Sequence, residues 1–134
     1  SYRNRILGVQ LFMGDMFGFL QWGYNFYYTQ FSRSLADPFA MTHCNYAFPS
    51  GDAYLVYPGP GGEPLTSLRA EVQSEGLTDL RALYTLEARI GREAVQSLVL
   101  DRAGMDVMTF TKYPTSAEYL LSLREAVFEA LEQA

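Results

Sequence analysis

Residues 18–28, GFLQWGYNFYY, are the stretch on which the predicted fold depends. Gly18 opens a short apolar run rich in residues that favour β-structure, and such a run is typical of a buried strand. After Gly23 the composition changes to aromatic side chains with polar tips, as expected where a strand leaves a core and enters a partly hydrated site. Flat aromatic faces with hydrogen-bonding edges suit sugar rings and other amphipathic ligands. The alternative is a core strand followed by an aromatic loop that only packs.

The rest of the chain predicts helices around a second strand, as judged from apolar periodicity, capping residues and Pro/Gly breaks. The predicted elements are, in order, a helix over Arg5–Phe17, a strand over Gly18–Trp22, a loop over Gln30–Gly51, a strand over Ala53–Tyr57, helices over Ser67–Ile90 and Glu93–Asp101, and a last helix begun by a capping box at Thr115–Glu118. This order predicts an α/β fold. The length of 134 residues predicts a single domain over residues 1–134.

Composition excludes several classes of protein. The chain is 49% hydrophobic with a net charge of −5 and no long basic run, so neither a membrane span nor nucleic-acid binding is expected. Cys44 is the only cysteine, which excludes an internal disulfide and favours a buried free thiol over a catalytic one. The adjacent His43 and Cys44 are too few ligands for zinc, and we expect no metal and no cofactor. The compartment is left open.

The predicted helix Ser67–Ile90 carries two features that need an explanation. Glu71, Glu75 and Asp79 follow at i, i+4 and i+8, where like charges repel, and a solvated face is the expected reason. Gly76 lies in the middle of the helix at a cost of about 1 kcal/mol relative to alanine, which predicts a kink or a close approach of backbones.

Three segments of the sequence, taken together, resemble a known family. They are GFLQWGYNFYY, FPSGDAYLVYPGPGGEP and SLRAEVQSEGLTDLRAL. In this order and spacing they are similar to the carboxy-terminal part of the catalytic domain of glycoside hydrolase family 123, also catalogued as domain of unknown function 4091. The resemblance covers about residues 4–100, and residues 101–134 would then form carboxy-terminal helices.

The resemblance implies a (β/α)8 barrel and retaining, exo-acting β-N-acetylgalactosaminidase activity. In that family the 2-acetamido oxygen of the sugar attacks the anomeric carbon. An adjacent Asp-Glu pair assists, the Asp orienting the acetamido group and the Glu acting as general acid and base. Sites in such barrels form at the carboxyl ends of strands. The resemblance places Trp22, Tyr24, Asn25 and Asp52 at the rim of a pocket for an N-acetylhexosamine-type carbohydrate. It adds Tyr57, at the end of its own strand, as a fifth substrate-binding residue.

The chain departs from the family pattern in two main respects. No Asp is followed by Glu anywhere in the sequence, so we assign no catalytic residue. A (β/α)8 barrel needs at least ~200 residues, and this chain would supply only about the last quarter of one. We therefore expect a carboxy-terminal barrel fragment of about two strands with flanking helices and a helical tail, inactive on its own. Smaller departures, Ser74–Gly76 and Leu80–Arg81, affect only helix surface contacts.

Other functions remain open from the residues alone. Asp52 with Glu71 is the one carboxylate pair within the chain that would suit glycoside hydrolysis. A non-catalytic carbohydrate-binding domain and a structural or assembly module are the further alternatives.

A homo-oligomer is also expected, because two strands cannot close a barrel and an all-round apolar first helix needs cover. The residues predicted to contribute to the contact are Ile6, Leu11, Phe12 and Met16.

Overall fold

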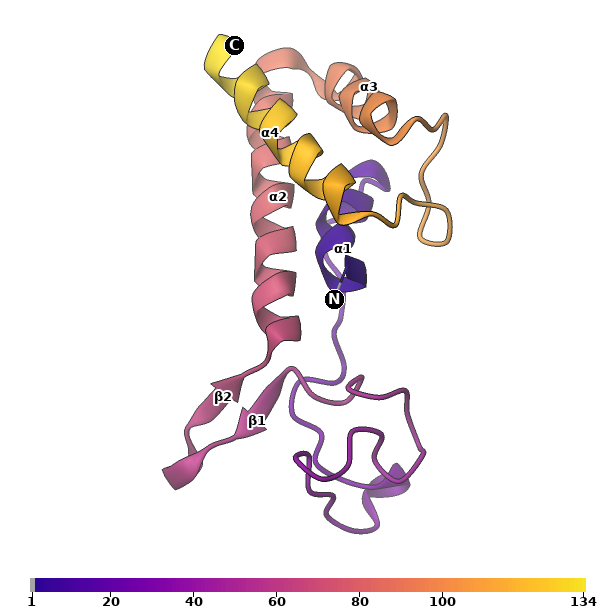
Figure 1. Ribbon diagram of the computed structural model, residues 1–134, viewed down its shortest axis with the longest axis vertical. Helices are drawn as coiled ribbons and strands as arrows, with labels where there is room; N and C mark the ends of the chain where they lie inside the picture. The colour runs from indigo at the N-terminus through magenta and orange to yellow at the C-terminus, as the bar shows by residue number, and fades with distance from the viewer. Residues whose placement is uncertain (1) are drawn as a thin grey trace. The chain divides into compact units, whose positions relative to one another are not determined.

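The computed structural model describes residues 2–134, which form four α-helices, one β-hairpin and two short 3-10 turns (Figure 1). The elements are α1 (Tyr2–Met13), η1 (Gln30–Ser32), β1 (Val56–Pro58), η2 (Pro60–Gly62), β2 (Pro64–Thr66), α2 (Leu68–Ile90), α3 (Arg92–Ala103) and α4 (Ala117–Gln133). Two compact units divide the chain. We call residues 1–18 with 72–134 the helical unit and residues 19–71 the aromatic unit.

The helical unit has an apolar core to which all four helices contribute. Ile6, Val9 and Phe12 of α1 are fully buried in it. The prediction of a nearly all-buried first helix is confirmed for residues 8–12, but α1 ends at Met13 rather than at Phe17, and Met16 and Phe17 are exposed. Its last turn closes as a Schellman motif, in which Met16 N donates to Leu11 O at 2.9 Å and Asp15 N donates to Phe12 O at 3.1 Å. Asp15 takes the left-handed conformation that this motif requires, with φ 52°.

The close approach predicted at Gly76 is confirmed, and its partner is Gly8 of α1. A Cβ atom on Gly8 would overlap the carbonyl oxygen of Gly76, and a Cβ on Gly76 would lie 2.6 Å from Arg5 O. Both obstacles are backbone atoms, which cannot move aside as a flexible side chain does. The two glycines therefore allow α1 and α2 to pack backbone to backbone.

The predicted ends of the later helices follow from capping. Ser67 Oγ accepts a hydrogen bond from Ala70 N at 3.1 Å at the start of α2. Gly91 and Gly104, with φ of 86° and 60°, separate α2 from α3 and end α3. The last helix begins as predicted, but its cap is Ser116, whose Oγ accepts from Tyr119 N at 3.2 Å, one residue after the predicted capping Thr115.

The two predicted strands differ from what the structure shows. Gly18–Trp22 is irregular, and its Leu20 side chain is 90% exposed, so the prediction of a buried strand is wrong. Backbone hydrogen bonds to residues 53–55 begin only after this segment: Phe26 N donates to Ala53 O, and Leu55 N donates to Tyr24 O. A strand forms only when a second segment pairs with it, and residues 18–22 have no such ladder among residues 2–134.

The strand predicted over Ala53–Tyr57 is present only as Val56–Pro58, and it pairs antiparallel with β2 (Figure 1). Gly61 and Gly62 have φ of 69° and 86°, and Gly59 N donates to Glu63 O at 2.7 Å. The chain reverses here through a tight turn, whereas parallel strands need a long crossover. The described residues are thus mainly helical with a single hairpin, and they show no barrel.

None of the helices in residues 2–134 combines the length and the apolar character needed to cross a membrane.

Candidate functional site

The aromatic unit brings Trp22 and Asp52 together, as the predicted site requires. The indole Nε1 of Trp22 donates a hydrogen bond to Asp52 Oδ2 at 3.1 Å, and both side chains are exposed. Gly23 makes this possible because a Cβ there would lie 2.8 Å from Ala53 Cα. The Trp-Gly-Tyr-Asn motif (residues 22–25) and the Ser-Gly-Asp motif (residues 50–52) therefore lie side by side, with their backbones in contact. The result is an oriented indole next to a carboxylate at the surface.

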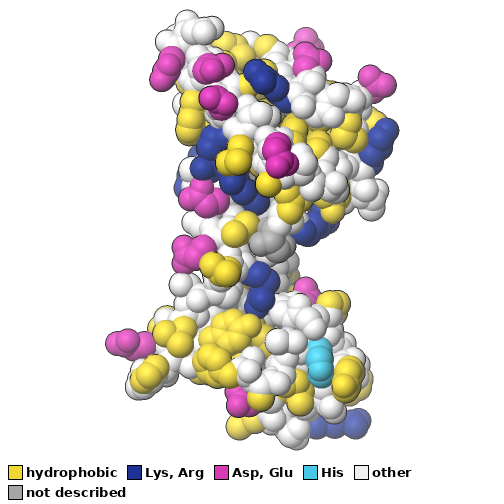
Figure 2. Space-filling view, in the orientation of Figure 1, with side chains coloured by type: hydrophobic (Ala, Val, Ile, Leu, Met, Phe, Trp, Pro, Cys, Tyr) yellow, Lys and Arg dark blue, Asp and Glu magenta, His cyan; other side chains and the backbone are white. Residues whose placement is uncertain are grey.

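Further aromatic rings surround Trp22 and form what we call the Trp22 cluster, made of Trp22, Phe26, Tyr28 and Phe48. The ring centroids of Trp22 and Phe48 are 4.6 Å apart, and Phe26 lies 5.7 Å from Trp22. Tyr28 extends the group at 5.8 Å from Phe26. Trp22 and Tyr28 keep 45% and 42% of their surface exposed. Hydrophobic side chains, yellow in Figure 2, gather on the visible face of the aromatic unit beside the hairpin.

The other predicted site residues are placed in different ways. Tyr24 is exposed, and its carbonyl oxygen accepts hydrogen bonds from Leu55 N and Val56 N at 2.8 and 3.1 Å. Asn25 is exposed and pairs with Tyr54 in an isolated bridge. The backbone thus holds both residues next to the segment that carries Asp52.

Tyr57 is half-buried and belongs to a second aromatic group. Its ring lies 5.7 Å from that of Tyr54 and 5.4 Å from that of Phe39. Its hydroxyl accepts a hydrogen bond from Arg69 Nη2 at 3.1 Å. The side chain of Tyr57 is therefore tied to Arg69 rather than to the Trp22 cluster.

Cys44 and Tyr54 form a buried polar pair below the surface of this unit. Cys44 Sγ lies 3.0 Å from Tyr54 Oη, which also donates to Met41 O at 3.0 Å. Burial raises the pKa of the Tyr54 phenol, so this hydroxyl stays protonated and keeps donating. The prediction of a buried free thiol is confirmed.

His43 is directed away from that thiol. Its Nδ1 accepts from Tyr46 N at 2.8 Å, and its ring stacks on Tyr46 at 4.1 Å. Adjacent in sequence, the two side chains diverge as expected, and no histidine base is aimed at Cys44. Among residues 2–134, no group of histidine, cysteine and carboxylate side chains is arranged to hold a metal ion.

In the acidic stripe of α2, Glu71 and Glu75 are exposed as expected, whereas Asp79 is structural rather than solvated. Asp79 is buried and accepts from Arg124 Nε at 2.6 Å and from Arg5 Nε at 3.1 Å. Arg124 also pairs with Glu75 at 2.8 Å, and this hydrogen bond lowers the pKa of the Glu75 carboxyl. The expectation of a solvated face is therefore wrong for Asp79, because cations from α1 and α4 neutralise it.

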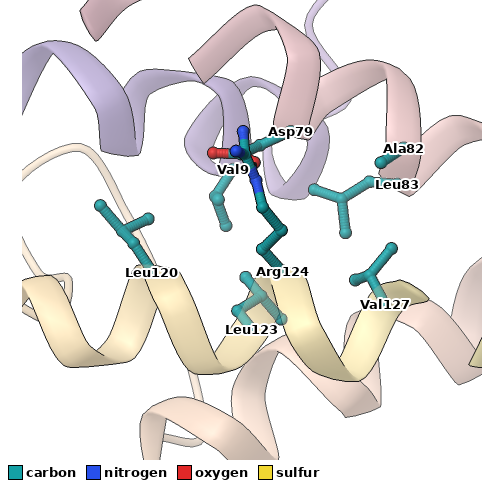
Figure 3. Close-up of a pocket in the computed structure, with 8 residues that line it drawn as sticks. All are labelled: Val9, Asp79, Ala82, Leu83, Leu120, Leu123, Arg124 and Val127. Atoms are coloured by element: carbon teal, nitrogen blue, oxygen red, sulfur yellow. Dashed lines mark hydrogen bonds and ion pairs between the residues drawn. The ribbon is translucent and has the colours of Figure 1, made fainter. Parts of the chain in front are cut away.

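A small cavity lies beside this ion-pair network, with Arg124 reaching from α4 toward Asp79 (Figure 3). Its volume is about 10 Å³, and a single water needs roughly 10–15 Å³. This cavity has no room for a sugar or a cofactor.

Sequence reasoning missed Phe48 and Arg69. Phe48 lies far along the chain from Trp22, and no local pattern indicates their contact. Arg69 did carry a signal, because a cation in the first turn of a helix is disfavoured by the helix dipole and needs a compensating partner.

Exposed aromatic rings with an oriented carboxylate at their edge are typical of a protein surface that binds amphipathic ligands such as carbohydrates. In a comparison with protein families, the model of the glycoside hydrolase 123 catalytic domain matches residues 1–86. The chain therefore belongs to the glycoside hydrolase 123 catalytic domain family. No curated protein matches the chain significantly.

Proposed function

We propose that the aromatic unit supplies the sugar-facing surface of a glycoside hydrolase 123 catalytic domain and that its ligand is an N-acetylhexosamine-type carbohydrate. The observation that carries the proposal is the Trp22–Asp52 hydrogen bond within an exposed aromatic cluster. Membership of the family supports a carbohydrate as the ligand. The site comprises Trp22 and Asp52, with Tyr24, Asn25 and Tyr57 at its margin.

The chemistry of the pair suits a sugar ring. The bond to Asp52 fixes the plane of the indole, so its face is held ready for the apolar C–H face of a pyranose. Oδ2 accepts from the indole, which leaves Oδ1 for a ligand hydroxyl, and hydrogen bonds to a charged group are among the stronger ones. Preorganisation of this kind lowers the entropy lost on binding.

This chain is expected to bind carbohydrate without cleaving it. The family's chemistry uses an adjacent Asp-Glu pair, and the sequence contains none. General acid and base catalysis contributes about 10²–10⁴-fold, so the chain should release no nitrophenol from an aryl N-acetyl-β-galactosaminide. The matched control is Trp22→Ala, which removes the stacking face. Release by the unaltered chain above the level of this control would contradict the proposal and would revive the Asp52 and Glu71 pair.

Ligand binding separates the proposed function from a structural or assembly module, but not from a non-catalytic carbohydrate-binding domain. A non-catalytic carbohydrate-binding domain would bind sugar through the same Trp22 cluster, without belonging to a hydrolytic site. A structural or assembly module would not bind sugar at all. The exposure of Trp22 and its bond to Asp52 favour a binding role over simple packing.

A homo-oligomer remains a prediction, but three of the four residues predicted to form its contact cannot do so. Ile6, Leu11 and Phe12 are covered by the chain's own core, and of the four predicted contact residues only Met16 is exposed. Light scattering decides the matter: a mass above one chain of 15.1 kDa is expected, and a monodisperse single chain would refute it.

A further inference from the structure

Arg69 holds both ends of the segment that carries Asp52. It lies in the first turn of α2, and its Nη2 donates to the carbonyl oxygen of Tyr54 and to Tyr57 Oη. On the other side, the guanidinium lies against Gly51, where a Cβ would be 2.7 Å from Nη1 and 2.8 Å from Cζ. The contacts of Arg69 thus fall immediately before Asp52 and two residues after it.

The backbone at Gly51 is built for this contact. Its φ of 81° is in the left-handed region that favours glycine, and the absence of a side chain leaves room for the planar group. The same segment also packs closely on Gly23, where a Cβ would lie 2.8 Å from Ala53 Cα. Residues 51–54 therefore contact both Gly23, which follows Trp22, and the guanidinium of Arg69.

Stability alone does not account for an arginine at this position. Its Nε is buried and has no hydrogen-bond partner among residues 2–134, and an unsatisfied buried donor costs free energy. The positive charge also lies at the unfavourable end of the α2 dipole. What arginine adds is a rigid planar fork that packs on Gly51 while it donates to Tyr54 and Tyr57.

We propose that Arg69 is a positioning residue that sets the Asp52 carboxylate at hydrogen-bond distance from the Trp22 indole. It acts through the backbone of Gly51 and Tyr54 and does not itself contact the sugar. The inference rests on the proposed function only in taking the Trp22–Asp52 pair as the part that faces the ligand.

The test reads the pair directly and needs no ligand. Trp22 is the only tryptophan, so the proton–nitrogen correlation spectrum of the full chain contains one indole cross-peak. Asp52→Ala defines the position of this cross-peak when the hydrogen bond is lost. Arg69→Met, which keeps the aliphatic stem, is expected to move the cross-peak toward that position and to speed exchange of the indole proton with water. Arg69→Lys, which keeps charge and donors but not the planar group, is expected to give an intermediate shift.

Two further variants keep the proposal falsifiable. Tyr57→Phe keeps the ring and removes only the hydroxyl, so it should shift the cross-peak in the same direction, and it decides the case if the Arg69 variants do not fold. Arg81→Met, on an exposed arginine of α2, should leave the cross-peak in place. A folded Arg69 variant with lowered thermal stability but an unmoved indole cross-peak would show a merely structural role and overturn the proposal. A moved cross-peak in a chain that binds no sugar would support the positioning role of Arg69 and would refute the proposed sugar site instead.

Discussion

Replacing Gly8 by alanine is expected to lower the free energy of unfolding by about 3 kcal/mol, because overpacking a tight contact typically costs 1–3 kcal/mol and sometimes more. The new Cβ would overlap Gly76 O, which is a backbone atom within a helix. Relief of this overlap requires α1 and α2 to separate, and that would open the core around Val9 and Phe12. For a domain with a total stability of about 5–15 kcal/mol, such a loss is large.

Urea unfolding followed by circular dichroism measures this loss. The matched control is Gly18→Ala, because a Cβ on Gly18 would meet no atom within 4 Å. That control should stay within about 0.5 kcal/mol of the unaltered chain. Equal unfolding midpoints for Gly8→Ala and Gly18→Ala would show that α1 and α2 do not touch at Gly8 and Gly76.

Replacing Asp79 by alanine is expected to have an effect of similar size, about 3 kcal/mol, the lower end of what breaking a buried ion pair costs. Asp79 is only 8% exposed, and its loss leaves the guanidinium groups of Arg5 and Arg124 without their shared partner. We take the lower end because both arginines keep part of their surface in water, 18% and 25%.

Thermal unfolding compares Asp79→Ala with Glu75→Ala, which removes the exposed partner of Arg124. The Glu75 variant should lose much less stability, since exposed ion pairs contribute little. Adding Arg124→Ala to Asp79→Ala should recover part of the loss, because one stranded charge is removed. An Asp79→Ala variant as stable as Glu75→Ala would refute the assignment of a structural role to the buried network.

The later helices were predictable because their signals are local. Ser67, Gly91 and Gly104 act on their own neighbours along the chain, so their positions already define helix ends. The strands were not predictable in the same way, because strand formation depends on a partner. The run after Gly18 has the composition of a strand but no ladder, and the Pro/Gly cluster at residues 58–62 reverses the chain into a hairpin.

The contacts within the candidate site were also predictable only in part. The Trp-Gly-Tyr-Asn and Ser-Gly-Asp motifs contain Trp22 and Asp52, and the structure joins these two side chains by a hydrogen bond. Phe48 and Arg69 enter through contacts between distant segments, which no spacing along the sequence specifies. Tyr57 was predicted as a substrate-binding residue at the end of its own strand, and the structure shows its hydroxyl accepting a hydrogen bond from Arg69.

The most direct measurement of the central claim follows the single Trp22 indole cross-peak while N-acetylgalactosamine is added to the full chain. A saturable shift of this cross-peak is expected, with a weaker response to galactose, which lacks the acetamido group, and none in Asp52→Ala. A cross-peak that stays fixed at the highest sugar concentration, in a chain shown to be folded, would contradict the assignment of the Trp22–Asp52 pair to a sugar site.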